Sequence, residues 1–308
     1  MKNKLLLCLA VLLLAVSMAA FVGCKAAGKA GGEITVGLTL PGLQFPFFVT
    51  MKNDFDQEAA KLGVKVIFID AQNDSSKQVA AIESFISQKV KGILISPMTT
   101  DSQVPAIEEA IKAKIPVATV DRKANTDKVL VHVGADNVEG GRAAGRYVLE
   151  KLGGKGGVIE LEGTPGASPA IDRKKGFDEI INPSGVKILV SQAADFNRAK
   201  ANSTMENLMQ AHPKFDAVFG ANDEMIIGAI EAISAAGIDP AKKVTVGYDA
   251  TTDALDYLKQ GKLGATIDQF PGKQAAMALN YLVDYIKNKK EPPQKVIYIA
   301  PQAVTSAK

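Results

Sequence analysis

The sequence of 308 residues has few of the side chains on which enzymes and metal sites usually depend: it contains two histidines, two cysteines and no tryptophan. His132 stands inside an apolar run and His212 precedes a proline, and neither has a nearby Cys, Glu or Asp at the spacing of metal ligands. No Gly-x-Ser-x-Gly elbow and no Gly-x-x-x-x-Gly-Lys-Ser/Thr phosphate loop occurs. We therefore expect no enzyme activity, no metal and no organic cofactor.

An excess of one charge sign is also missing. Lys and Arg number 36 against 33 Asp and Glu, which leaves a formal net charge of +3, and the basic residues are scattered. Nucleic-acid-binding surfaces and polybasic membrane patches need clustered positive charge, so we expect neither nucleic acid nor a membrane surface as a direct partner. Hydrophobic residues make up 47% of the chain, which is enough for a sizeable core in two domains or one large one.

The N-terminus has the order of a secretory signal peptide. Residues 1–4 are Met-Lys-Asn-Lys, and an apolar run begins at Leu5 and leads to Gly23-Cys24. An uncleaved anchor helix is the alternative, because the run is nearly long enough to span a bilayer. Residues 21–24, Phe-Val-Gly-Cys, resemble the bacterial lipoprotein cleavage box, in which the cysteine becomes the acylated N-terminus.

Cleavage at that box divides the N-terminal region into two parts. We predict a lipoprotein signal peptide at 1–23 and a flexible tether at 24–32. Cys8 is lost with the signal, so Cys24 is the only mature cysteine and no intrachain disulfide forms. The expected location is the periplasm or the outer face of the cell membrane, with the lipid on Cys24 as the only membrane contact.

From Glu33 onward, strand-like apolar runs alternate with amphipathic helical windows, which is the pattern of a parallel sheet flanked by helices. We predict strands near residues 33–39, 64–69, 92–96, 115–120 and 129–133, and a second series near 157–161, 186–191, 216–219, 243–248 and 263–268. Both series contain a strand, a polar turn, a helix and a strand that ends in aspartate, Asp121 or Asp249. This repetition predicts an α/β fold of two doubly wound parallel-sheet lobes, with a single long sheet as the alternative.

In open α/β sheets, ligands bind beyond the carboxyl ends of the strands. The positions just after the predicted strands are 44–48, Ser96, Asp121-Arg122, the turn after Glu162, Phe196, Asn222-Asp223, Asp249 and Gln269. Almost every residue at these positions has an aromatic or a hydrogen-bonding side chain. A monosaccharide has weakly apolar faces that aromatic rings cover, and a rim of hydroxyls that Asp, Asn, Gln and Arg bind. A monosaccharide is therefore the predicted ligand.

Phe45, Phe47 and Phe48 surround Pro46 at a predicted turn from strand to helix. Pro46 suits the first helical turn, where its missing N–H costs nothing, and Phe47 and Phe48 are predicted to stack on the sugar. Phe48 lies seven residues before Phe55 on the same helical face, so core packing is an equally good interpretation for it.

For polar residues near three other strand ends, a turn or a helix cap is the alternative to a binding role. Asp121-Arg122 can form charge-assisted, bidentate bonds to vicinal hydroxyls, although most such pairs are solvated turns. One residue of 222–224 is expected to cap a helix, and if Asp223 does so, Asn222 is free to face a cleft. Residues 70–74 lack the glycine and glutamate of a calcium loop, so they predict a surface turn with a cap at Ser75 or Ser76.

At these residues the sequence resembles the periplasmic ribose-binding protein family, the type I solute-binding proteins of sugar ABC transporters. The similarity runs from Glu33 to about residue 300, and its strongest pieces lie at 46–49, 120–122, 135–138, 194–196, 222–225, 247–249 and 265–269. It implies a periplasmic binding protein type I fold in which three strands form the hinge, near Ala135, Phe270 and Ala300. The implied lobes are 33–135 plus 270–299 and 136–269 plus 300–308.

The resemblance also implies a set of ligand contacts. Its stacking aromatics fall on Phe47, Phe48 and Phe196, and its hydroxyl-binding residues fall on Asp121, Arg122, Asn222, Asp249 and Gln269.

Three positions depart from the ribose binders. Phe45 and Ser96 stand where those proteins have asparagines, and their binding arginine aligns with Ile171, which leaves Arg173 two positions later. Phe45, Ser96 and Arg173 complete the predicted site. Relatives that bind hexoses or furanose forms of galactose look more like this version, so we expect a monosaccharide other than ribose.

The expected mechanism is capture of the sugar by hinge closure in a lipid-tethered monomer, followed by delivery to an ABC transporter permease with a separate ATPase. A sensor that presents its ligand to a membrane receptor is the main alternative. A sugar-responsive transcription regulator needs DNA-binding helices where the signal peptide stands. A sugar-modifying enzyme needs paired acid and base groups, for which only Asp121 and Asp249 are candidates.

Overall fold

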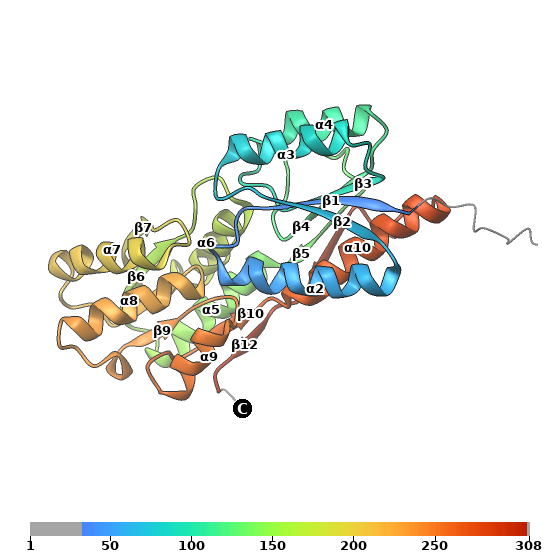
Figure 1. Ribbon diagram of the computed structural model, residues 1–308. Helices are drawn as coiled ribbons and strands as arrows, with labels where there is room; N and C mark the ends of the chain where they lie inside the picture. The colour runs from blue at the N-terminus through green and yellow to red at the C-terminus, as the bar shows by residue number, and fades with distance from the viewer. Residues whose placement is uncertain (1–32, 307–308) are drawn as a thin grey trace, which may run out of the picture. The chain divides into compact units, whose positions relative to one another are not determined.

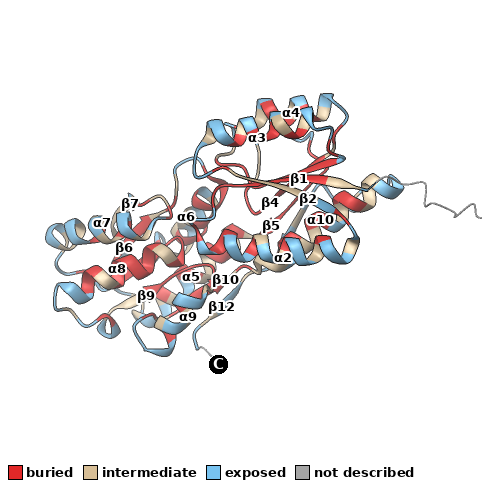
Figure 2. Ribbon diagram, in the orientation of Figure 1, coloured by how far each residue is buried: buried red, intermediate tan, exposed pale blue. Residues whose placement is uncertain are grey.

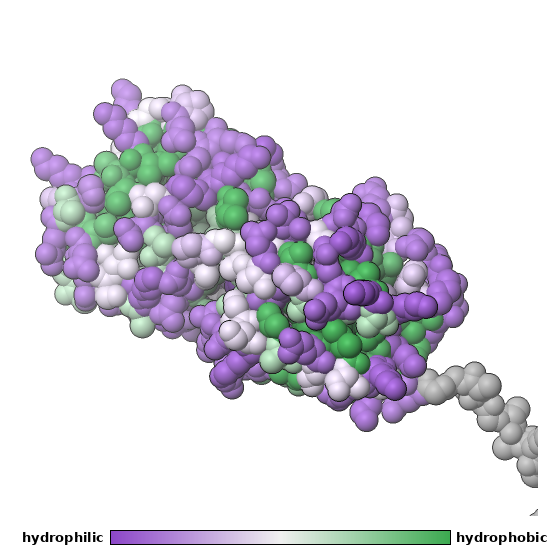
Figure 3. Space-filling model, turned by 90° about the horizontal axis from the view of Figure 1, so that it is seen from above, coloured by the Kyte–Doolittle hydropathy of each residue, from purple (hydrophilic) through white to green (hydrophobic). Residues whose placement is uncertain are grey.

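The computed structural model describes residues 33–306, and Thr35–Lys308 forms one compact unit. The predicted signal peptide at 1–23, the tether at 24–32 and the lipidated Cys24 lie outside the described residues. Among the described helices, none has the length and hydropathy needed to cross a membrane. Hydrophilic residues cover most of the face shown in Figure 3, with smaller hydrophobic groups between them.

The first sheet has six parallel strands in the order β11-β5-β4-β3-β1-β2. Its strands are β1 (Thr35–Leu40), β2 (Lys65–Asp70), β3 (Gly92–Ile95), β4 (Val117–Val120), β5 (Val131–Ala135) and β11 (Val296–Ile299). Its helices are α2 (Pro46–Leu62), α3 (Ser75–Ser87), α4 (Val104–Lys112) and α10 (Pro271–Asn288). Helices α3 and α4 lie on one face of the sheet, and α2 and α10 lie on the other (Figure 1).

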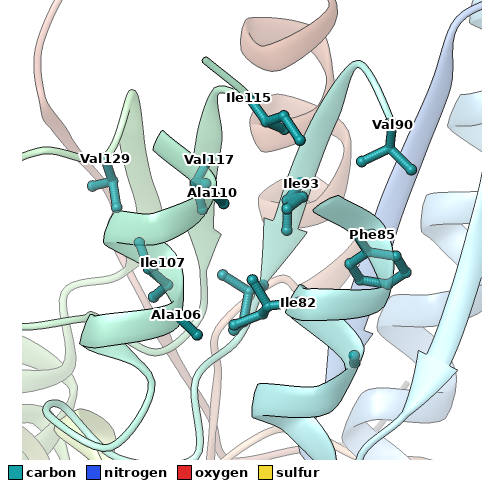
Figure 4. Close-up of a cluster of buried hydrophobic side chains, with 12 residues drawn as sticks. Ile82, Phe85, Val90, Ile93, Ala106, Ile107, Ala110, Ile115, Val117 and Val129 are labelled. Atoms are coloured by element: carbon teal, nitrogen blue, oxygen red, sulfur yellow. The ribbon is translucent and has the colours of Figure 1, made fainter. Parts of the chain in front are cut away.

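The core under α3 and α4 explains why these segments fold as they do. Ile82 and Phe85 of α3 and Ile107 of α4 are fully buried against Ile93 of β3 and Val117 of β4 (Figure 4). The central strands are buried along their whole length, as Figure 2 shows, which is why they read as continuous apolar runs in the sequence.

Helix α3 begins one residue away from the expected cap. Asp74, and not Ser75 or Ser76, caps it, because the Asp74 carboxylate accepts hydrogen bonds from the backbone N–H groups of Ser76 and Lys77. The prediction overlooked that an aspartate in extended backbone is at least as good a cap as serine.

The second sheet has four parallel strands in the order β7-β6-β8-β9. Its strands are β6 (Gly156–Glu162), β7 (Val186–Ala193), β8 (Ala217–Gly220) and β9 (Val244–Val246). Its helices are α5 (Asn137–Lys151), α6 (Ser168–Ile181), α7 (Arg198–Ala211), α8 (Asp223–Ala235) and α9 (Thr252–Lys259), with a short 3-10 turn at Pro240–Lys242. Helices α5 and α6 approach closely because Gly141 and Gly176 face each other's helix: a Cβ on Gly176 would lie 1.9 Å from the Val138 carbonyl oxygen.

The chain passes between the two sheets three times. It leaves β5 for α5 just after Ala135, and it returns from β10 (Thr266–Asp268) to α10 through Phe270. It leaves the first sheet again between β11 and β12 (Gln302–Val304), and β12 pairs antiparallel with β10. These are the three expected hinge crossings, so the structure confirms two doubly wound parallel-sheet lobes joined by three segments.

Candidate ligand-binding site

One pocket collects residues from the carboxyl ends of strands in both sheets. Its empty space, which includes space open to solvent, is about 320 Å³. It is lined by Phe45, Phe47, Phe48, Asp121, Arg122, Pro169, Arg173, Phe196, Asn222, Asp249 and Gln269. Ten of the eleven residues predicted to contact the ligand therefore lie together, and all ten are buried.

The aromatic part of the pocket begins at the turn before α2. Phe45 is the residue that precedes the helix, and Pro46 occupies its first turn as expected. The rings of Phe47 and Phe48 meet edge to face with centroids 5.2 Å apart, and Phe45 packs on Phe48 at 6.2 Å. Phe48 is 3% exposed and lines the pocket, so it serves both interpretations that the sequence left open.

Phe196 supplies an aromatic ring from the second sheet. It follows β7 with a φ of +58°, a conformation that a bulky residue adopts only under constraint. Gly163 makes room for the ring, since a Cβ at that position would lie 2.1 Å from the Phe196 Cζ. The ring also lies 5.6 Å from the Arg122 guanidinium and 5.8 Å from that of Arg173. These contacts hold the ring at the pocket.

Asp121 and Arg122 form the charged group of the first sheet. The Ser96 hydroxyl donates to Asp121 Oδ2 at 3.1 Å, and Arg122 Nε lies 3.9 Å from the same oxygen. Arg122 Nη1 donates to the Met98 carbonyl, whereas its Nε has no hydrogen-bond partner among the described residues. Burial raises the pKa of Asp121 against the opposing effect of Arg122, and burial lowers the pKa of Arg122 to about 10.

Arg173 and Asp249 form the matching group of the second sheet. Arg173 is fixed by bonds from Nε to Asn137 Oδ1 at 2.8 Å and from Nη1 to the Ala221 carbonyl at 2.7 Å. Its guanidinium lies 3.7 Å from the centre of the Tyr248 ring, and Nη1 is 3.6 Å from Asp249 Oδ1.

Asp249 is held from its other side. Gln269 Nε2 donates to Asp249 Oδ1, and Gln274 Nε2 donates to the Gln269 carbonyl at 2.8 Å. Burial raises the pKa of Asp249 well above its usual value, and Arg173 opposes that rise. Gln269 and Arg173 thus both lie at the same oxygen of Asp249, Oδ1.

Asn222 lines the pocket as expected, but its role at the start of α8 differs from the expected one. Asn222, and not Asp223, caps α8, since its Oδ1 accepts from the Met225 N–H at 3.0 Å. Asp223 is fully buried and accepts from Thr251 and Thr266, and burial raises its pKa to about 7. The cap fixes the Asn222 side chain and still leaves it on the pocket wall.

At two of the positions that depart from the ribose binders, 96 and 171, the side chain does not line the pocket. Ser96 is fully buried and does not line the pocket: its hydroxyl bonds to Asp121, so it supports a pocket residue instead of lining the pocket itself. Ile171 is 51% exposed and lies outside the pocket, whereas Arg173 is 3% exposed and lines it. The substitution at 171 therefore has no bearing on which ligand fits, and the prediction was wrong on this point.

Sequence reasoning missed Pro169, Asn137 and Tyr248. Pro169 lies one helical turn before Arg173 and shares its face, so the helical spacing could have found it. Asn137 and Tyr248 do not line the pocket and act by holding Arg173. No pattern in the sequence indicates that contact.

The charges in the pocket are balanced, with two carboxyl groups and two guanidinium groups arranged in pairs. Such a site favours an uncharged ligand with several hydroxyls over an amino acid or a phosphate ester, which would leave an unpaired charge in a buried place. Within residues 33–306, no group of three or more His, Cys, Asp and Glu residues is placed to hold a metal ion.

Comparison with known proteins identifies the family of this chain. The family described as periplasmic binding protein domain matches residues 36–290. The ribose import binding protein of Bacillus subtilis is 43% identical over 258 residues, which cover 84% of this chain and 83% of that protein. The structure of a galactofuranose binding protein has a TM-score of 0.85 at 33% identity and covers 88% of this chain and 94% of that one. The fructose binding periplasmic domain of a hybrid two-component system has a TM-score of 0.83 at 30% identity, with coverages of 89% and 91%. This chain belongs to the periplasmic binding protein family, among its type I sugar-binding proteins.

Proposed function

We propose that this protein captures one monosaccharide outside the cytoplasm and delivers it to the permease of an ABC transporter that has a separate ATPase. The observation that carries the proposal is the pocket of about 320 Å³, in which phenylalanines from both sheets accompany two charge-balanced Asp–Arg pairs. Rings of this kind cover the faces of a sugar, and the paired charged groups bind its hydroxyls. Lipidation of Cys24 would tether the protein as a monomer to the membrane.

A sugar other than ribose is the favoured ligand, with a hexose or a furanose form of galactose first. Phe45 lines the pocket, so a position that is polar in ribose binders is apolar here. The similarity to a galactofuranose binding protein supports this choice, while the similarity to the ribose protein of Bacillus subtilis makes ribose the necessary comparison.

Capture would proceed by closure of the two lobes, 33–135 plus 270–299 and 136–269 plus 300–308. Aspartate and arginine residues of both lobes meet at the pocket, so a ligand gains its full set of contacts only when the lobes are together. For a small ligand so enclosed, a Kd of about 1 µM is ordinary.

A sensor that presents its ligand to a membrane receptor is the second candidate. The similarity to the fructose binding domain of a two-component system favours it. Purification from membranes with the candidate permease or with a receptor kinase as bound partner separates the two functions.

Thermal unfolding of residues 33–308 tests the binding step. The panel contains D-ribose, D-galactose, D-allose, D-fructose, L-arabinose and myo-inositol at millimolar concentration, with nucleosides and sugar alcohols beside them. A ligand that binds only the folded state raises the Tm, and we expect one or two monosaccharides to do so in the wild type but not in Asp249→Ala. No rise with any sugar overturns the proposal.

A further inference from the structure

The loop after β4 makes direct hydrogen bonds to the start of α6, which belongs to the other sheet. The backbone N–H of Lys123 donates to Ser168 Oγ at 2.8 Å, and Lys123 Nζ lies 2.9 Å from Asp172 Oδ2. Ser168 and Asp172 are four residues apart, so they lie on the same face of α6. Lys123 therefore contacts the second lobe at two points along one helix face.

The same lysine also contacts strand β11 of its own lobe, just before the third crossing. Lys123 Nζ is 3.2 Å from the hydroxyl of Tyr298 in β11, one residue before the end of that strand. A further backbone bond joins the lobes nearby, from the Thr100 N–H to the Gly166 carbonyl at 2.9 Å. None of Lys123, Ser168, Asp172, Thr100 and Gly166 lines the pocket.

We propose that Lys123, Ser168 and Asp172 form a latch, which holds the lobes closed and thereby sets the affinity for the sugar without touching it. Any movement that separates the two sheets breaks both latch bonds, so they stabilise the closed state alone. The apparent Kd of a protein that must close to bind depends on how much of it is closed beforehand. The effect on affinity rests on the proposed function, whereas the effect on closure does not.

The position of the latch couples it to the site. Lys123 directly follows Asp121 and Arg122, which line the pocket from the first lobe, and Ser168 precedes Pro169, which lines it from the second. The latch thus joins the two lobes next to their ligand-facing residues. Because its bonds need no sugar, a measurable closed population is expected in the free protein.

The two polar contacts differ in the expected size of their effect. In Ser168→Ala the Lys123 N–H, which is partly buried in the closed form, loses its acceptor, and this predicts a closed-to-open ratio lower by about 5- to 50-fold. The Lys123 and Asp172 side chains are 33% and 20% exposed, so Asp172→Asn is expected to lower the ratio by only about 2- to 5-fold. The wild-type ratio is also expected to fall at 0.5 M NaCl, and the Asp172→Asn ratio much less.

Residues 33–308 contain no cysteine, so a distance across the lobes can be measured with two introduced labels. Ser87→Cys in the first lobe and Asn207→Cys in the second are both exposed. Single-molecule energy transfer between dyes at these sites, without any sugar, gives the open and closed fractions directly. Lys175→Ala is the matched control, because Lys175 is an exposed lysine on the same helix outside the latch.

Support for the latch requires a closed population in the free wild type, its loss in Ser168→Ala and Asp172→Asn, and no change in Lys175→Ala. In a double-mutant cycle, Lys123→Met and Asp172→Asn together should lower the free energy of closure by less than the sum of the two single losses. A free wild type that is entirely open, or variants with an unchanged distribution, overturns the proposal. Titration with D-ribose and D-galactose separates the two ideas: closure that depends on the latch while no panel sugar binds refutes the proposed function alone.

Discussion

Replacement of Asp249 by asparagine is the sharpest test of the pocket as a sugar site. The carboxylate accepts from Gln269 through Oδ1, and Asp249 lines the pocket. Asparagine has the same shape as the aspartate that adopts a φ of +118° at this position. The exchange therefore replaces one acceptor and its charge with an amide and leaves the packing in place.

The expected loss follows from the bond that disappears. A hydrogen bond from a ligand hydroxyl to a charged carboxylate contributes about 1.5–3 kcal/mol, so the Kd for the sugar identified by the thermal panel should rise by about 10- to 150-fold. Isothermal titration calorimetry measures it. The Tm without sugar is recorded first, because the comparison requires a folded variant.

Asp253→Asn is the matched control for this experiment. Asp253 lies four residues later in the same lobe, its side chain is 58% exposed, and it pairs with Arg198 outside the pocket. Its exchange removes the same charge and should change the Kd by less than about twofold. If folded Asp249→Asn binds the sugar as tightly as Asp253→Asn does, the assignment of Asp249 to the ligand is wrong.

Two further predictions concern stability. Burial lowers the pKa of His132 to about 3 in the folded state, against about 6.5 in the unfolded chain. Between these two pH values the unfolded state binds more protons than the folded state does. The contribution of His132 to the free energy of unfolding is therefore lost as the pH falls below 6.5. Urea unfolding at pH 7 and pH 5 should show about 2 kcal/mol of this loss in the wild type but not in His132→Gln, and an equal loss in both would contradict the assignment. Gly176→Ala should lower the free energy of unfolding by about 1–3 kcal/mol or more, because the added Cβ meets the Val138 carbonyl oxygen, and it should weaken sugar binding by moving Arg173 with α6. The neighbouring exposed Lys175→Ala should do neither, and a wild-type free energy of unfolding in Gly176→Ala would show that the helices can separate at no cost.

The sheets could be predicted from the sequence because buried parallel strands appear as unbroken apolar runs. All ten predicted strands are present with bounds that differ by at most three residues, and the predicted contact residues that the rule of carboxyl ends selected lie, all but Ser96, at one pocket. Strand β11 was not among the predicted strands, since its burial is incomplete and its sequence, Val-Ile-Tyr-Ile, follows a proline-rich stretch.

Side-chain direction was harder to predict, since it depends on neighbours that are distant in the sequence. Ser96 follows a strand, like the contact residues, yet its hydroxyl bonds to Asp121, which is 25 positions away. The error at Ile171 was avoidable, because two residues along a helix correspond to a rotation of about 200°. Arg173 shares its face with Pro169 and the buried Phe177, so the helical period already places Arg173 inward and Ile171 outward.

The polar groups of the pocket are largely held by hydrogen bonds to other groups of the protein. Asn222 caps a helix, Gln269 is bonded to Asp249, and Arg173 is held by Asn137 and the Ala221 carbonyl. A ligand therefore has few side chains to order on binding, and fixed groups discriminate strongly among sugars that differ in one hydroxyl. On the proposed mechanism, the remaining cost of binding is the closure of the lobes. The affinity should consequently be adjustable at the contacts between the lobes, where Lys123 meets α6, with the choice of sugar left unchanged.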